Sequence, residues 1–304
     1  MQLPATVRRQ IEEQADALGF PALQRAAAAL SDAYREGRSA RLSAEERTAA
    51  YLVTRMPATY AAAHTVLREV SVRIGAVSSI LDAGAGTGAA SLAARDYFPD
   101  ASITLVERDL SFAAAARQWL PEATLLANDI ARIDKLPPHD LVIAAYSLGE
   151  FGAEIAARLW NAACIALVLI EPGTPSGFTL IRKIRTALLA AGAHMVAPCP
   201  AETECPIADP DWCHFAARVE RSSLHRRVKG GELGHEDEKF SYLALSRRPV
   251  ELPAARIIRH PQHRPGLIEI ETCTPAGLRS ERITKRDRES FRAARKASWG
   301  DAGI

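Results

Sequence analysis

The 304 residues are 48% apolar, enough to bury a sizeable core in one large domain or one domain with additions. No apolar run approaches the roughly 20 residues of a membrane-spanning helix, and no stretch resembles a secretory signal, so we expect a cytoplasmic protein. The net charge of +2 is unevenly placed, because residues 213–304 hold 19 Lys/Arg against 12 Asp/Glu, and that asymmetry can mark a nucleic-acid surface.

Residues 1–75 are predicted to be helical. Apolar residues recur at helical spacing before Gly19, which ends the first helix. Ser43 and Glu46 have the spacing of a capping box, and Pro57 should kink or break the helix that follows. The pattern predicts helices over Leu3–Leu18 and Pro21–Arg35, a third that begins after Ser43, and a fourth that ends near Ile74.

Residues 77–192 alternate between strands and helices, which predicts a parallel, doubly wound α/β sheet of the Rossmann type. Each predicted strand is a short apolar run. These runs are Val77–Leu81, Ile103–Val106, Thr124–Ala127, Leu141–Tyr146 and Ile165–Ile170, with a further strand at Ser241–Leu245.

Three alternating glycines, Gly84, Gly86 and Gly88, follow the first strand and precede a helix of small residues. Glycine allows a sharp turn and a close approach of the backbone to a ligand, and amides at a helix start favour a polar or anionic group. Open α/β sheets bind nucleotides at this position. We therefore predict a nucleoside-cofactor site, with a purely structural glycine turn as the alternative.

Three acidic residues favour S-adenosylmethionine over NAD, although the glycine spacing also fits a loose dinucleotide fingerprint. Asp82 can meet the ammonium group of the cofactor, directly or through water. Glu107 can accept both ribose hydroxyls, as an acid does in NAD folds too, and Asp129 follows the third strand, where adenine would lie. The predicted cofactor-binding residues are Asp82, Gly84, Gly86, Gly88, Glu107, Asp129 and Tyr146.

The loop Tyr146-Ser147-Leu148-Gly149-Glu150 follows the fourth strand, where methyltransferases of this fold place the groups that orient the accepting atom. The loop carries neither the Asn-Pro-Pro-aromatic motif of amino methylation nor a nucleophilic cysteine. Methyl transfer needs mainly in-line positioning, so an enzyme and a non-catalytic binding protein both stay open. We assign no catalytic residue.

Cys199, Cys205 and Cys213 lie within fifteen residues of an irregular segment, and Cys273 lies far along the chain. In a reducing compartment, cysteines are more often thiols or metal ligands than disulfides. Four thiolates can close a tetrahedral zinc site or hold a 4Fe–4S cluster. Spacing does not choose between iron and zinc, and ordinary thiols are the alternative. Cys164 is expected to be a plain core thiol.

Two basic stretches near the C-terminus are candidates for RNA binding, since Lys and Arg neutralise phosphates. The alternative is a solvated helix face. The candidate residues are Arg226, Arg227, Lys229, Arg292, Arg295 and Lys296. The stretch Arg256–Cys273 further predicts a β-hairpin around Pro265-Gly266.

Several stretches together resemble the mitochondrial small-ribosomal-subunit methyltransferase-like assembly proteins and their bacterial relatives, over nearly the whole chain. They are Leu81–Gly88, the cysteine block from Pro198 through Trp212-Cys213-His214-Phe215, Lys229-Gly230-Gly231-Glu232, Glu236-Asp237-Glu238-Lys239-Phe240-Ser241-Tyr242, Ala294-Arg295-Lys296, and Trp299-Gly300-Asp301. The glycine motif is common to many methyltransferases, whereas the cysteine block with the Glu236–Tyr242 stretch is far more specific.

We expect three regions: an N-terminal helical region at 1–75, a class I methyltransferase-like domain at 76–250 with a cysteine insertion at about 198–230, and a basic extension at 251–304. The resemblance covers nearly all of them. It implies S-adenosylmethionine binding and a 4Fe–4S cluster on Cys199, Cys205, Cys213 and Cys273, which would make the extension cysteine-ligated. It also implies action on the small ribosomal subunit and its rRNA, by methylation or in subunit assembly. The expected state of the free protein is a monomer.

Overall fold

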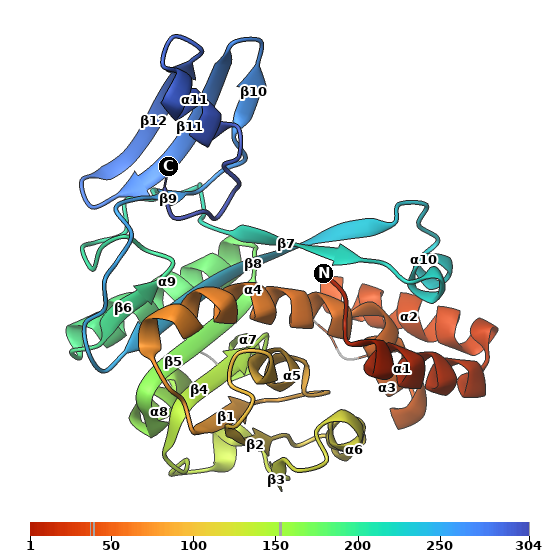
Figure 1. The fold of residues 1–304 in the computed structure, drawn as a ribbon. Coiled ribbons are helices and arrows are strands. Elements are labelled where there is room, and N and C mark those ends of the chain that lie inside the picture. Colours follow the sequence, from red (N-terminus) through yellow and green to blue (C-terminus); the bar gives the residue numbers. More distant parts are fainter. Residues whose placement is uncertain (37, 39, 152–153, 304) are drawn as a thin grey trace.

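The computed structural model of the protein describes residues 1–36, 38, 40–151 and 154–303. Helices from the N-terminal quarter lie beside and across a large mixed sheet, and a small second sheet built from the C-terminal residues stands above it (Figure 1). No helix in these described ranges is both long and apolar enough to cross a membrane.

Four helices precede the sheet, as predicted, and they are α1 (Ala5–Leu18), α2 (Phe20–Arg35), α3 (Ala44–Thr54) and α4 (Met56–Ile74). The capping box is confirmed, because the Ser43 hydroxyl accepts the Glu46 amide and the Glu46 side chain accepts the Ser43 amide. The chain breaks at Arg55, so Pro57 lies in the first turn of α4, where its missing amide hydrogen costs nothing.

The main sheet has the strand order β3-β2-β1-β4-β5-β8-β6, and β7 pairs with β8. Its strands are β1 (Ser79–Ala83), β2 (Ser102–Val106), β3 (Thr124–Leu126), β4 (His139–Ala145), β5 (Ala163–Pro172), β6 (His194–Ala197), β7 (Phe215–Glu220) and β8 (His235–Ser246). The first five strands are parallel, which confirms the predicted doubly wound sheet, and β8 runs antiparallel between β5 and β6. The fold is an α/β Rossmann-like fold.

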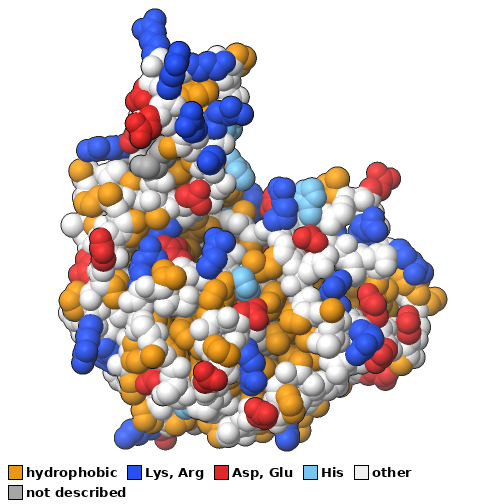
Figure 2. Space-filling model, viewed as in Figure 1, with side chains coloured by type: hydrophobic (Ala, Val, Ile, Leu, Met, Phe, Trp, Pro, Cys, Tyr) orange, Lys and Arg blue, Asp and Glu red, His pale blue; other side chains and the backbone are white. Residues whose placement is uncertain are grey.

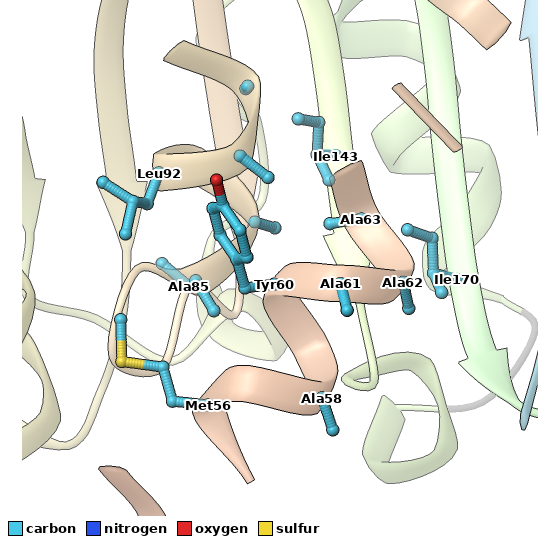
Figure 3. Close-up of a cluster of buried hydrophobic side chains, with 14 of the residues drawn as sticks. Met56, Ala58, Tyr60, Ala61, Ala62, Ala63, Ala85, Leu92, Ile143 and Ile170 are labelled. Atoms are coloured by element: carbon cyan, nitrogen blue, oxygen red, sulfur yellow. The ribbon is translucent and has the colours of Figure 1, made fainter. Parts of the chain in front are cut away.

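Helices cover both faces of this sheet, as the alternating sequence pattern requires. The helices that follow α4 are α5 (Ala89–Arg95), α6 (Leu110–Trp119), α7 (Leu148–Phe151), α8 (Ile155–Ala162), α9 (Pro175–Ala190) and α10 (Ser223–Lys229), and a 3₁₀ turn spans Ile130–Arg132. On one face, the small side chains of α4 approach the sheet closely. Figure 3 shows Ala62 and Ala63 of α4 beside Ile170 of β5 and Ile143 of β4.

Residues from 256 onward form a second sheet with its own small core. Its elements are β9 (Arg256–Ile257), β10 (Gln262–Arg264), β11 (Leu267–Thr274), β12 (Gly277–Thr284) and the helix α11 (Arg288–Ala294). Ile257, Ile268, Ile270 and Ala294 are buried together. The hairpin predicted around Pro265-Gly266 is confirmed by β10 and β11. Strand β12 has no apolar alternation because most of its side chains are exposed, and periodicity therefore did not reveal it.

Arg256 joins this second sheet to the main domain. Its buried guanidinium donates to the carbonyls of Pro198 and Gly300, at 2.8 and 2.7 Å, and forms an ion pair with Glu69 of α4. Glu69 also accepts a 2.8 Å hydrogen bond from the Tyr242 hydroxyl of β8. One cation thus ties together a helix, the cysteine-bearing segment and the C-terminal residues.

Replacing Arg256 with methionine should lower the free energy of unfolding by about 3 kcal/mol, because the Pro198 and Gly300 carbonyls would lose their donor and Glu69 would keep Arg73 as its one cationic partner in the described residues. Arg264→Met is the matched control. Arg264 pairs with Glu269 at an exposed site, and such pairs contribute at most about 1 kcal/mol. Urea unfolding followed by circular dichroism measures both variants. Equal losses would contradict a coupling role for Arg256.

Candidate functional site

The glycine loop lies between β1 and α5, at the carboxyl ends of the parallel strands. Gly84, Gly86 and Gly88 have φ angles of 75°, 55° and 76°, a region in which other residues are strained. The amides of Gly84 and Ala85 donate to the Val106 carbonyl of β2, at 2.9 and 3.0 Å. The loop is therefore fixed by the neighbouring strand, and its turn needs glycine.

Asp82 lies beneath this loop and is almost fully buried. One carboxylate oxygen, Oδ2, accepts hydrogen bonds from the Ser91 amide and hydroxyl, at 3.1 and 2.6 Å. The other oxygen, Oδ1, is buried and has no hydrogen-bond partner. Burial raises the pKa of the Asp82 carboxyl to about 6, although the hydrogen bonds from Ser91 oppose the shift. The unpaired Oδ1 can accept a hydrogen bond from a ligand.

Glu107 follows β2 and braces the loop from the other side. Its Oε2 accepts the Gly86 amide and its Oε1 accepts the Asp109 amide, both at 2.7 Å. Burial raises the pKa of Glu107, and the hydrogen bonds from the Asp109 and Gly86 amides oppose that shift. Each carboxylate oxygen can accept more than one donor, so Glu107 remains able to bind ribose hydroxyls.

A cleft of about 1280 Å³ opens above the loop, larger than the roughly 300–1,000 Å³ of most small-ligand pockets. Gly84, Gly86, Glu107 and Tyr146 line it together with Asp82. Residues of α2, the α3–α4 junction and the end of α10 form the remaining walls. Figure 1 shows how α2 and α10 come to lie near each other to one side of the sheet.

Two predicted cofactor residues have other contacts. A Cβ on Gly88 would lie 3.0 Å from Leu120, so this glycine permits close packing of α5 against α6. The Asp129 carboxylate accepts the Ala131 amide at 2.9 Å and pairs with Arg108 at 3.3 Å. Its neighbours Asn128 and Ile130 line the described cleft, and Asp129 does not. The adenine role of Asp129 stays a prediction.

The four cysteines Cys199, Cys205, Cys213 and Cys273 line one cavity of about 60 Å³. Burial, and then the nearby thiols, raise the pKa of Cys213 well above its usual range and that of Cys273 to about 11. Within the described ranges, however, no group of three or more His, Cys, Asp or Glu side chains is arranged to hold a metal ion. The predicted metal centre and the cysteine-ligated extension are therefore not shown. Cys164, expected in the core, is exposed.

The predicted RNA-binding residues fall into two separate groups. Arg226, Arg227 and Lys229 lie on α10, where Arg227 stacks over the Phe20 ring and Lys229 pairs with Glu236. The second group lies on α11 and directly after it, next to the second sheet. Its members, Arg292, Arg295 and Lys296, are exposed. Figure 2 shows Lys and Arg side chains gathered over the small upper part of the molecule.

A family model described as mitochondrial small ribosomal subunit Rsm22 matches residues 45–303. The chain belongs to the Rsm22 family. It is 27% identical over 329 residues to Rsm22-cox11 tandem protein 2 of Schizosaccharomyces pombe, covering 86% of this chain and 44% of that protein. It is 24% identical to the human ribosome assembly protein METTL17, covering 83% of this chain and 61% of that protein. It thus spans about half the length of these curated relatives.

Solved methyltransferase structures overlap with this Rsm22-family chain. The plantazolicin methyltransferase BpumL in complex with SAH is 13% identical, with a TM-score of 0.46, over 80% of this chain and all of that one. The N-methyltransferase NodS from Bradyrhizobium japonicum with S-adenosyl-L-homocysteine is 15% identical, with a TM-score of 0.39, over 60% and 84%. The fold class stated above follows from the strand order.

The sequence did not reveal two aromatic residues that line the cleft, Tyr34 of α2 and Tyr51 of α3. Arg55, at the α3–α4 junction, lines the cleft as well, and Glu238 of β8 pairs with Arg55 at 3.8 Å. Glu238 is part of the charged stretch before Phe240. Glu236 and Glu238 are two residues apart, and this spacing places both side chains on one face of a strand. That spacing was the signal that the sequence offered.

Asp82→Asn should stabilise the ligand-free protein at pH 7.5 by about 1–3 kcal/mol. The folded Asp82 keeps its proton up to about pH 6, whereas an unfolded aspartate loses it near pH 3.9, so stability falls as pH rises between these values. Asparagine removes that dependence. Calorimetric melting between pH 4 and 8 measures the effect.

Asp140→Asn is the control with the opposite sign. Hydrogen bonds from the Ser78 hydroxyl and amide lower the pKa of Asp140, so that carboxylate stabilises the fold near neutral pH and ceases to do so in acid. Identical pH profiles for Asp82→Asn and the wild-type protein would mean that folding does not raise the pKa of Asp82.

Proposed function

We propose that this chain binds S-adenosylmethionine in the cleft and acts on the small ribosomal subunit, through rRNA methylation or subunit assembly. The unpaired Oδ1 of buried Asp82, below a loop of left-handed glycines, carries the proposal. A buried carboxylate oxygen without a donor is costly, and the cofactor's ammonium group would supply that donor. Glu107 would then bind the ribose.

The ribosomal part of the proposal rests on the family and on charge. METTL17 is named as a ribosome assembly protein, and the family description names the small ribosomal subunit. The basic groups on α10 and around α11 are suited to phosphates. Arg226 is exposed and has no ion pair within the described residues, so it is the α10 cation most available to rRNA.

A non-catalytic assembly factor is the second candidate function. The Ser147 hydroxyl after β4 donates to the Ala83 carbonyl at 3.0 Å, and Leu148 and Gly149 have no polar side-chain atoms. In the described part of this loop, Tyr146 therefore offers the one uncommitted side-chain polar atom; the Glu150 side chain lies outside the described residues. This favours a role in which cofactor binding matters more than catalysis.

We also propose that Cys199, Cys205, Cys213 and Cys273 hold a 4Fe–4S cluster, with zinc as the alternative. The observation in support is that three thiols of one short segment and the distant Cys273 of β11 line one cavity. Their mutual repulsion as thiolates would be relieved by bound iron. Such a cluster would staple β11 to the segment before β7, because metal-binding free energy adds to folding free energy.

Gly86→Val should weaken S-adenosylhomocysteine binding at least about tenfold, because a side chain here would occupy the space where the ligand approaches the backbone. A Cβ on Gly86 meets no protein atom within 4 Å. Gly192→Val is the matched control, because Gly192 also has a positive φ and an open Cβ position, but it lies outside the cleft. Isothermal calorimetry measures both affinities. If the wild-type protein does not bind S-adenosylhomocysteine, the proposed cofactor site is wrong.

Anaerobically purified protein should be brown and contain about four irons per chain, as a thiolate-held 4Fe–4S cluster requires. Cys273→Ser should remove the colour and expose the second sheet to proteolysis, whereas Cys164→Ser should leave both unchanged, because Cys164 lies outside the cavity. Stoichiometric zinc in a colourless protein would favour the structural zinc alternative. Metal-free protein with four reactive thiols would exclude both centres.

A further inference from the structure

Tyr146 is the most unusual residue in the cleft. Its φ of 57° makes it the single non-glycine residue with a positive φ in the described ranges. Such a backbone costs about 1–3 kcal/mol and persists where surrounding structure imposes it, often at functional sites. The Tyr146 hydroxyl is also buried and makes no hydrogen bond of good geometry, although the Glu238 carboxylate lies close enough to act on it. Strain and an unpaired hydroxyl together indicate that this side chain is held ready for a ligand.

Tyr34 and Arg55 form a stacked pair in the same cleft. The Arg55 guanidinium lies 4.9 Å from the centroid of the Tyr34 ring, and Tyr34 is 56% exposed, which is high for a large aromatic residue. Glu238 fixes Arg55 from behind at 3.8 Å, with only 15% of its side chain exposed. An aromatic ring with a stacked guanidinium is a surface on which nucleobases stack.

Burial, and then the Glu238 carboxylate, raise the pKa of Tyr146 well above its usual range. The phenol therefore keeps its proton near neutral pH and can donate a hydrogen bond. Tyr51 lines the cleft beside Arg55, and its pKa is raised by burial, with Arg55 opposing. The two tyrosines and the arginine thus present neutral hydroxyls beside one delocalised cation.

The cleft is lined by seven cationic and four anionic side chains, and most of the cations pair with carboxylates inside or beside the cleft. The excess of cations suits a nucleic-acid backbone. On the α10 side, Glu236 holds both Arg221 and Lys229, and a Cβ on Gly231 would lie 2.7 Å from the Arg221 guanidinium. The loop from Lys229 to Gly231 is therefore fitted around Arg221 at the mouth of the cleft.

From these features we infer that Tyr34, Arg55 and Tyr146 form a subsite for one nucleobase of single-stranded RNA, beside the cofactor. The base stacks on the Tyr34–Arg55 surface, the Tyr146 hydroxyl donates to it, and rim cations contact the flanking phosphates. Glu238 is a positioning residue that holds Arg55. The cleft volume exceeds that of one small ligand, so it can accept a base as well. The inference rests on the proposed cofactor site, which occupies the glycine-loop end.

The test measures binding of a fluorescent ten-nucleotide single-stranded RNA at 50 and 200 mM salt, with saturating S-adenosylhomocysteine. Tyr34→Ala should weaken binding about tenfold at both salt concentrations, because stacking does not release counterions. Tyr146→Phe should weaken binding about three- to tenfold. Tyr97→Phe is the matched control, since Tyr97 bonds to His64 away from the cleft and should change binding less than about twofold.

Two further variants separate base contacts from charge and from stability. Arg55→Lys keeps the charge but loses the planar surface, so it should behave like Tyr34→Ala. Arg226→Ala should instead reduce the salt slope by about one unit, as expected for one phosphate contact. Tyr146→Phe should change the melting temperature little, because the hydroxyl lies near Glu238 without forming a hydrogen bond of good geometry.

A backbone-only RNA that lacks bases should bind the wild-type protein and Tyr34→Ala equally. If Tyr34→Ala, Arg55→Lys and Tyr146→Phe all bind the base-containing RNA within about twofold of the wild-type protein, the subsite is refuted. The subsite is also refuted if these variants weaken the binding of an arginine-rich peptide but leave RNA binding unchanged. Calorimetry with S-adenosylhomocysteine on the same proteins reports separately on the cofactor proposal.

Discussion

Strand β8 is the constraint on which the rest of the molecule depends. It pairs with β5, β6 and β7, and its side chains alternate between two faces. On one face, Glu236 holds the α10 loop, Glu238 holds Arg55, and Tyr242 bonds to Glu69. On the other, the Ser241 hydroxyl donates to the Cys213 carbonyl at 2.8 Å. A one-residue slip would exchange these faces and disconnect the cleft, the cysteine cavity and the second sheet together.

The cysteine-bearing segment has little regular structure and is held by two buried arginines instead. Arg185 of α9 donates to the carbonyls of Ala201 and Thr203, at 2.9 and 2.7 Å. Arg256 donates to the Pro198 carbonyl from the opposite side. Charge-assisted hydrogen bonds of this kind are stronger than neutral ones, so they can fix backbone that no helix or strand holds. These guanidiniums also place positive charge beside the thiols.

Local sequence signals predicted the parts of the molecule that depend on local physics. The glycine loop, the capping box at Ser43 and the break before Pro57 each follow from the conformations of adjacent residues. The aromatic residues of the cleft were not predicted, because Tyr34 and Tyr51 come from two different helices that lie far from the glycine loop in the sequence. The Asp129 carboxylate caps a 3₁₀ turn, a local contact that its position after a strand did not indicate.

The C-terminal motif Trp299-Gly300-Asp301 was recognised by resemblance, and the structure gives it a packing role. The Trp299 ring lies edge-on to His214, with centroids 4.8 Å apart, and to His260 at 4.6 Å. The Gly300 carbonyl accepts Arg256, and the Asp301 carbonyl accepts the Ile257 amide. The motif therefore packs against the cysteine-bearing segment. The position of the motif in the sequence did not indicate this contact.

The place of β8 in the sheet sets the order in which the protein can be completed during synthesis. Strands β5 and β6 leave the ribosome before β8, yet β8 must lie between them. Until residue 246 has emerged, the nascent chain exposes the unpaired edge of β5, whose residues Ala166–Glu171 are buried in the finished protein. Open apolar edges of this kind invite pairing with other chains. The incomplete chain is therefore prone to aggregate through the β5 edge until β8 has been synthesised and has paired with it.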